Sequence, residues 1–347
     1  MHTRCSFARA TVAPMIVGGI LLAGVASALA QEPLHIAKQG SIEAGGEVIF
    51  CATNDGGDPK SQRWPPGRVV INHVYATYQY PTNQTYKYPI LFNLGGGHSA
   101  RVYDTTPDGR EGWLTLFPRQ GFAVYGVDRV NTGRAGSDIC KINAVKLGVA
   151  SVAELPAINR YSFESAWVNF RWGPTYGTFY PDTQFPTETV DNYFAQTLST
   201  YRDPQELQKS VAALSALVDK VGPVILESWS SSGLIIFKTA IARPDLVKGI
   251  LALESNPALF EAISDEELKR LLKIPILNTI ADRNEETVVG ARKFQKRMQA
   301  AGGHFTVDAL PESGIRGNGH TMMLERNNKV IMDRMVKWLR ETVPGRD

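Results

Sequence analysis

A run of three serines, Ser230, Ser231 and Ser232, could supply a nucleophile for covalent catalysis. The run follows the apolar segment 223–229 and precedes an apolar helical pattern, so it lies where a buried strand turns into a helix. Ser228, Ser230 and Ser232 form a small-x-Ser-x-small pattern, a relaxed form of the Gly-x-Ser-x-Gly nucleophile elbow. Small neighbours are needed because the nucleophile adopts a strained backbone conformation in a tight turn. The alternative is a serine cluster that only caps the helix.

A histidine and two carboxylates that could serve Ser230 follow it in the sequence. His320 lies in a glycine-rich loop after the last predicted strand and could act as general base, although a loop histidine without a role is the alternative. Glu254 and Asp282 each follow a predicted apolar strand, and either carboxylate could orient the imidazole. Asp282 has the commoner position, and either acid could instead cap a nearby turn. The chain order serine, acid, histidine agrees with a triad built on an elbow.

A Gly-Gly-Gly-His segment at 95–98 follows an early apolar strand. Glycines in this position let backbone amides point toward a developing oxyanion, so we expect the Gly97 and Ser231 amides to form an oxyanion hole. The segment lacks the Gly-Lys-Ser/Thr signature and the glycine spacing of nucleotide-binding loops. His98, beside this loop, and Trp229, beside the nucleophile, are candidate substrate contacts.

The elements that must position these residues alternate between strands and helices, which favours an α/β fold. Residues 34–51, which contain Gly45 and Gly46, are typical of an edge hairpin. We expect strands at 68–80, 88–93, 122–128, 223–229, 247–253, 274–281 and 305–310, and helices at 112–119, 204–220, 232–243, 264–272, 286–301 and 325–342.

Residues 141–205 are expected to form an inserted, aromatic-rich cap within a single domain at 31–347. Aromatic residues are dense between 161 and 201, and prolines at 174, 181 and 186 interrupt that stretch. Such rings could roof an apolar substrate pocket or could attach the cap to the main domain. We expect both functions, with most of the rings structural.

The N-terminus has the pattern of a signal peptide spanning residues 1–30. Arg4 and Arg9 precede an apolar stretch, and Ala28-Leu29-Ala30 fits a cleavage site near Ala30. The mature protein is therefore expected to be periplasmic or secreted and not membrane-bound, with an uncleaved anchor as the alternative. The formal net charge of +3 is too small to indicate nucleic-acid binding.

Two cysteines, Cys51 and Cys140, would remain in the mature protein. An isolated pair in an oxidising compartment favours a disulfide over two separate thiols. No cluster of cysteine and histidine residues in the sequence predicts a metal site.

Several motifs together resemble those of the α/β-hydrolase superfamily, and more narrowly a group of exported bacterial carboxylesterases with a Ser–Glu–His triad. The resemblance implies an α/β-hydrolase fold, with a mostly parallel central sheet, helices on both faces and an inserted cap. It implies Ser230 as nucleophile, Glu254 as acid and His320 as base. The sequence departs from that group at Trp229 and Leu94, where histidines are usual. The matching segments are 104–113, 142–148, 182–186, 228–233, Glu254 and 317–328.

The resulting expectation is a serine carboxylesterase that hydrolyses small carboxylic esters without metal or organic cofactor. The same triad could serve a lactonase, a perhydrolase or a peptidase, and the scaffold could belong to a non-catalytic binding protein. A homodimer is expected only because dimers are common among soluble proteins.

Overall fold

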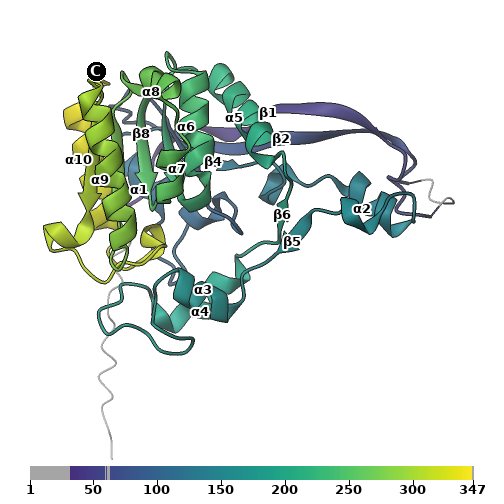
Figure 1. Cartoon of the computed structure of the whole chain (residues 1–347), viewed down its shortest axis with the longest axis horizontal. Helices are drawn as coiled ribbons and strands as arrows, with labels where there is room; N and C mark the ends of the chain where they lie inside the picture. The colour runs from purple at the N-terminus through teal and green to yellow at the C-terminus, as the bar shows by residue number, and fades with distance from the viewer. Residues whose placement is uncertain (1–31, 59, 61–62, 346–347) are drawn as a thin grey trace, which may run out of the picture. The chain divides into compact units, whose positions relative to one another are not determined.

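An eight-stranded, mostly parallel sheet forms the centre of the compact unit Leu34–Asp347 (Figure 1). The computed structural model describes residues 32–58, 60 and 63–345, so the predicted signal peptide lies outside the described residues. In spatial order the strands are β1 (Ile36–Cys51), β2 (Gly67–Pro81), β4 (Val124–Asp128), β3 (Ile90–Asn93), β7 (Val224–Trp229), β8 (Val247–Leu253), β9 (Ile276–Ile280) and β10 (Phe305–Ala309).

The six strands from β4 to β10 in this order run parallel, whereas β1 and β2 are antiparallel to their neighbours. Strands β3, β4, β7 and β9 are buried along their whole length, as expected for apolar strands covered on both faces. The carboxyl ends of the parallel strands meet at one edge of the sheet, where ligands bind in α/β folds. This edge receives the predicted nucleophile, both candidate acids and the glycine-rich loop.

Helices cover both faces of the sheet, and two hydrophobic clusters fill the space beneath them. Side chains of α1 (Trp113–Arg119) and α10 (Asn328–Thr342) belong to one cluster. The other cluster contains side chains of α5 (Glu206–Val221), α6 (Gly233–Ala242), α7 (Pro257–Glu261), α8 (Asp265–Leu271) and α9 (Glu285–Ala300). The predicted α/β fold, with a mostly parallel sheet and helices on both faces, is confirmed.

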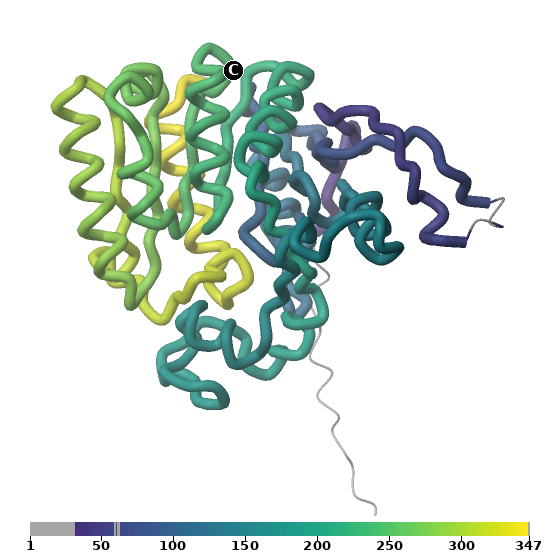
Figure 2. The backbone as a smooth tube through the Cα atoms, turned by 45° about the vertical axis from the view of Figure 1, so that its right-hand side comes forward, coloured from purple at the N-terminus to yellow at the C-terminus, as the bar shows by residue number. Residues whose placement is uncertain are grey.

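The prediction of an edge hairpin at residues 34–51 is wrong, because this segment is the single strand β1 paired with β2. Gly45 and Gly46 lie inside the strand with φ values of 69° and 85°. A Cβ atom on Gly45 would lie 2.6 Å from the Ala213 backbone of α5, so this glycine lets the helix pack closely on the strand. Figure 2 shows the β1–β2 ribbon extending beyond the rest of the sheet.

A disulfide between Cys51 and Cys140 joins the end of this ribbon to α2 (Ile139–Lys146). The bond expected from the sequence is thus present in the structure.

Residues 141–205 contribute no strand to the eight-stranded sheet. They contain the two-stranded sheet of β5 (Ala157–Asn159) and β6 (Thr200–Arg202), and the short helices α3 (Phe163–Asn169) and α4 (Val190–Ala195). Most of their large rings belong to the hydrophobic cluster beside α1 and α10, among them Trp167, Trp172, Phe185 and Tyr193. Within the part of the chain that the structure describes, no helix combines the length and hydrophobicity that a membrane span requires.

Candidate active site

Ser230 occupies the turn between β7 and α6 with a left-handed backbone conformation, at a φ of 58°. Residues other than glycine rarely adopt this conformation, so the surrounding structure must impose it. The Ser232 hydroxyl accepts a hydrogen bond from the Trp229 amide at 3.0 Å and closes the turn. A Cβ atom on Gly233 would lie 2.6 Å from the end of the Leu259 side chain, so glycine lets this side chain pack closely on the helix start. Ser232 and Gly233 therefore serve the turn through a hydrogen bond and close packing.

His320 is fixed from two sides in the loop before the 3₁₀ turn η7 (Met322–Leu324). Its amide donates to the Phe170 carbonyl at 2.9 Å, and its carbonyl accepts a hydrogen bond from Trp229 Nε1 at 2.7 Å. The Phe170 ring lies nearly parallel to the imidazole, with centroids 5.4 Å apart and an interplanar angle of 9°. Among the described residues, His320 Nε2 has no hydrogen-bond partner.

Glu254 follows β8 and also has a left-handed backbone, with a φ of 54°. Its Oε2 lies 3.1 Å from His320 Nδ1 and accepts a hydrogen bond from Asn284 Nδ2 at 3.0 Å. Oε1 accepts a hydrogen bond from the Ala281 amide at 2.7 Å, and the carboxylate also forms an ion pair with Arg171. The carboxylate is thus fully hydrogen-bonded although its side chain is 0% exposed.

The electrostatic surroundings keep Glu254 ionised. Burial alone would raise the pKa of this carboxyl group, but the charge of Arg171 and the hydrogen bond to His320 outweigh burial and lower the pKa to about 2. A negative charge therefore faces the His320 ring at neutral pH. Such a charge stabilises the imidazolium that forms when a histidine accepts a proton.

Asp282 lies beside the loop that leads to His320 but bonds to backbone groups. Its carboxylate accepts a hydrogen bond from the Gly317 amide, and its own amide donates to the Asn318 carbonyl at 3.1 Å. Glu325 holds the same loop from the other side, with Oε1 accepting a hydrogen bond from the Gly319 amide at 2.8 Å. Burial raises the pKa of Glu325 to about 7. The two acids thus fix the path of residues 317–319.

The glycine-rich loop after β3 packs against the elbow. A Cβ atom on Gly95 would lie 2.8 Å from the Trp229 ring, so glycine permits this close approach. Gly97 has a φ of 75°, and its carbonyl accepts a hydrogen bond from the Leu198 amide at 2.7 Å. Gly97 and Ser231 both line one cavity of about 470 Å³.

Comparison with known proteins agrees with this architecture. No family model matches the sequence. A solved structure of a novel bacterial esterase is 32% identical and superposes with a TM-score of 0.82, covering 90% of this chain and 98% of that chain. The chain belongs to the α/β-hydrolase superfamily.

Weaker similarities to other proteins are also found. The probable secreted lipase phiG of Fungal sp. (strain ATCC 74256) is 26% identical, with a match that covers 77% of this chain and 86% of that protein. A dienelactone hydrolase of Anabaena variabilis ATCC 29413 is 10% identical with a TM-score of 0.42, over 86% of this chain and 99% of that chain.

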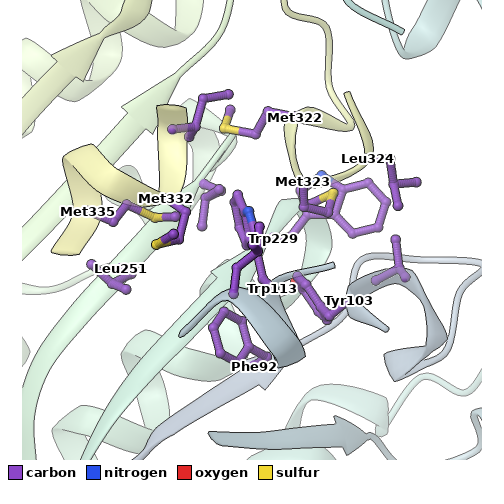
Figure 3. Packing of buried hydrophobic residues seen from close by; sticks show 14 of the residues in the cluster. Phe92, Tyr103, Trp113, Trp229, Leu251, Met322, Met323, Leu324, Met332 and Met335 are labelled. Atoms are coloured by element: carbon purple, nitrogen blue, oxygen red, sulfur yellow. The ribbon is translucent and has the colours of Figure 1, made fainter. Parts of the chain in front are cut away.

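The two candidate substrate contacts, His98 and Trp229, are both buried in this hydrolase. His98 is 1% exposed, and its nitrogens lie 2.7 Å from the Gly96 carbonyl and 2.7 Å from the Tyr193 hydroxyl. Burial lowers the pKa of His98 to about 4, so the ring is neutral at physiological pH. Trp229, the last residue of β7, belongs to the buried cluster that also contains Met322 and Met323 (Figure 3). Neither residue lines the cavity.

Arg171 is a site residue that sequence reasoning missed. Its guanidinium reaches from the inserted segment to Glu254 and also donates to the Asp282 carbonyl at 2.9 Å. Its backbone has a φ of 58°, and it follows Phe170, which contacts His320. No local pattern marks an arginine within an aromatic-rich segment as the partner of an acid 83 residues away.

The cavity is lined both by the inserted segment (residues 141–205) and by residues next to the central sheet. Its lining is not the aromatic one that the sequence suggested. Tyr161 is its one aromatic lining residue among the described residues. Its charged lining residues are Arg129, Arg160, Arg202 and Glu206. Most rings of the inserted segment thus lie outside the cavity lining, which combines these charged groups with the apolar side chains of Leu207, Leu234 and Ile235.

Proposed function

We propose that the protein is an exported serine carboxylesterase that hydrolyses small carboxylic esters through an acyl-enzyme intermediate. The observation that carries the proposal is the arrangement of His320, whose Nδ1 lies 3.1 Å from Glu254 while its Nε2 has no partner among the described residues. An imidazole held in this way can accept a proton at Nε2. The similarity to a bacterial esterase and to a probable secreted lipase supports both the activity and the export.

In the proposed reaction Ser230 Oγ attacks the ester carbonyl, and His320 Nε2 accepts the hydroxyl proton. Glu254 holds the imidazole through Nδ1 and stabilises its positive form. His320 then returns the proton to the leaving alkoxide. Water, activated by His320, attacks the acyl-enzyme, releases the acid and restores the Ser230 hydroxyl.

The amides of Gly97 and Ser231 are proposed to bind the oxyanion of each tetrahedral intermediate. Both residues line the cavity, and Ser231 directly follows the proposed nucleophile. The start of α6 adds the positive end of its helix dipole behind the same turn. Each donor in such a site contributes about 3 kcal/mol to transition-state stabilisation.

Asp282, the alternative acid, is proposed to have a structural role, because its carboxylate accepts from the Gly317 amide. His98 and Trp229 are proposed to position the site and not to contact substrate. Trp229 supports His320 through the hydrogen bond to its carbonyl, and His98 braces the glycine-rich loop at Gly96.

Substitution of Ser230 by alanine tests this proposal. Ser230→Ala should reduce kcat for p-nitrophenyl butyrate by on the order of 10⁴-fold or more, with an unchanged unfolding temperature. Ser228→Ala is the matched control, because Ser228 lies two residues before Ser230 at the end of β7 and its buried hydroxyl has no hydrogen-bond partner among the described residues. An active Ser230→Ala variant would refute the nucleophile. A panel of lactones, peracid-forming reactions and amides separates the esterase from the other acyl-transfer activities.

A further inference from the structure

The cavity beside the elbow holds more positive than negative charge. Three arginines line it, Arg129, Arg160 and Arg202, against the single carboxylate of Glu206. Within the described residues, Arg160 and Arg202 form no ion pair, and Arg160 Nε bonds only to the Thr197 hydroxyl at 3.3 Å. A cleft whose charged lining groups are mainly of one sign attracts the opposite charge.

Arg129 is the buried member of this group. It follows β4, is 6% exposed, and its Nη2 lies 3.4 Å from Glu206 Oε1. Its Nη1 donates to the Ser231 hydroxyl at 3.3 Å, which places the guanidinium beside the proposed oxyanion hole. Its Nε is buried without a partner among the described residues. Burying a donor without a partner costs free energy, so this group is suited to a ligand that supplies an acceptor.

Arg202 and Arg129 line the cavity from different elements. Arg202 belongs to β6 of the inserted segment, whereas Arg129 directly follows β4 of the main sheet. Tyr161 lines the same cavity, and the charges of both arginines act on its hydroxyl: burial raises the pKa of Tyr161, and Arg202 and Arg129 oppose that rise. The two sides of the cavity thus each provide a guanidinium.

We propose that this cavity binds a carboxylate of the substrate, so that the enzyme prefers esters carrying a second, ionised carboxyl group. Arg129 and Arg202 would hold the carboxylate, and Arg160 would add to the positive field at the cavity mouth. Guanidinium groups match a carboxylate with two parallel hydrogen bonds, which makes such contacts strong and selective. This inference rests on the proposed esterase function and adds its substrate class.

Pairs of esters of equal shape test the preference. Monomethyl adipate is compared with methyl hexanoate for an acyl-side carboxylate, and 4-acetoxybutyrate with butyl acetate for an alcohol-side carboxylate. We expect kcat/KM for at least one anionic ester to exceed that of its neutral partner by about tenfold or more. Arg202→Gln should reduce this ratio by about tenfold, mainly by raising KM for the anionic ester. Arg270→Gln, on an exposed position of α8, is the matched control.

Binding separates this inference from the proposed reaction. Calorimetry in the Ser230→Ala background should show that monomethyl adipate binds, that methyl hexanoate binds at least tenfold more weakly, and that Arg202→Gln abolishes the difference. Arg129→Gln should have the same effect. If the substitution at the buried Arg129 prevents folding, Arg202→Gln alone still tests the inference. Equal binding of monomethyl adipate and methyl hexanoate, or a ratio unchanged in Arg202→Gln, would overturn the inference. Failure to hydrolyse any ester despite selective binding of monomethyl adipate would overturn the esterase proposal alone.

Discussion

Phe170 and His320 are joined by a hydrogen bond between the His320 amide and the Phe170 carbonyl at 2.9 Å and by parallel rings 5.4 Å apart. The next residue, Arg171, pairs with Glu254. Two consecutive residues of the inserted segment therefore contact the proposed base and the proposed acid. The segment does more than cover the site, because it fixes the geometry of the pair.

Removal of the Arg171 charge should weaken both folding and catalysis. Arg171→Met leaves the buried Glu254 carboxylate without its cation, so we expect the free energy of unfolding to fall by about 3 kcal/mol and kcat/KM by about tenfold. The charge of Arg171 is the main influence that lowers the Glu254 pKa, so without it the loss of activity on protonation of Glu254 should begin at higher pH.

Arg243→Met is the control for Arg171, because Arg243 forms an ion pair with Asp219 in which both side chains are well exposed. Such a pair contributes about 0–1 kcal/mol, so stability and the pH profile should hardly change. A stable Arg171→Met variant with an unshifted pH profile would show that the cation has no part in positioning Glu254.

The two candidate acids should differ sharply in their effect on turnover. Glu254→Gln removes the negative charge beside His320 and should reduce kcat by on the order of 10⁴-fold. Asp282→Asn weakens the contact with the Gly317 amide and should lower the unfolding temperature with a loss of kcat below about tenfold. Steady-state kinetics on purified, folded variants decides between them, and the opposite order of losses would assign the acid to Asp282.

Burial of Glu325 should make stability depend on pH near neutrality. Its pKa is raised from 4.5 in the unfolded chain to about 7 in the folded protein. The contribution of the protonated Glu325 carboxyl group to the free energy of unfolding is therefore fully present below pH 4.5 and is lost as pH rises through about 7. Glu325→Gln cannot ionise, so the stability of the variant relative to wild type should rise by up to about 3 kcal/mol between pH 5 and pH 8.

Chemical denaturation at several pH values measures this change for Glu325→Gln and for the exposed control Glu261→Gln. The control should show a constant difference from wild type. An equally constant difference for Glu325→Gln would mean that Glu325 titrates as an exposed carboxyl group does.

The disulfide should stabilise the fold without affecting the site. Cys51 and Cys140 are 89 residues apart, and loss of a bond closing such a loop costs about 2–4 kcal/mol. The Cys51→Ser/Cys140→Ser double variant should therefore unfold at lower temperature and keep the kcat/KM of wild type. Mass spectrometry after alkylation under denaturing conditions should find both thiols masked until a reductant is added, and freely alkylated thiols in untreated protein would exclude the bond.

Local patterns predicted most of the strands of the sheet. A short apolar run between two polar turns is compatible with few structures other than a buried strand. The strand expected at 223–229 is Val224–Trp229, and that expected at 247–253 is Val247–Leu253. The glycine pair Gly45-Gly46 misled the same reasoning, since Gly45 packs closely against Ala213 and Gly46 against Ile71 and His73 of β2, and the pair forms no turn between two strands.

The site could be predicted only in part. Ser230 and His320 were predicted from motifs and position, whereas position left Glu254 and Asp282 open and only the family resemblance favoured Glu254. The structure brings Glu254 and His320 to 3.1 Å. Arg171 and Arg129 were missed because their partners are distant in sequence. A positively charged cavity depends on how β6 and the end of β4 meet in space, which no local spacing encodes.

The central claim is that Ser230 is the nucleophile, and covalent labelling tests it most directly. The wild-type protein is treated with a fluorophosphonate, and the modified peptide is mapped by mass spectrometry. We predict one label per chain, on Ser230, absent in Ser230→Ala and retained in Ser228→Ala. A label on a different serine, or undiminished labelling of folded Ser230→Ala, would contradict the account.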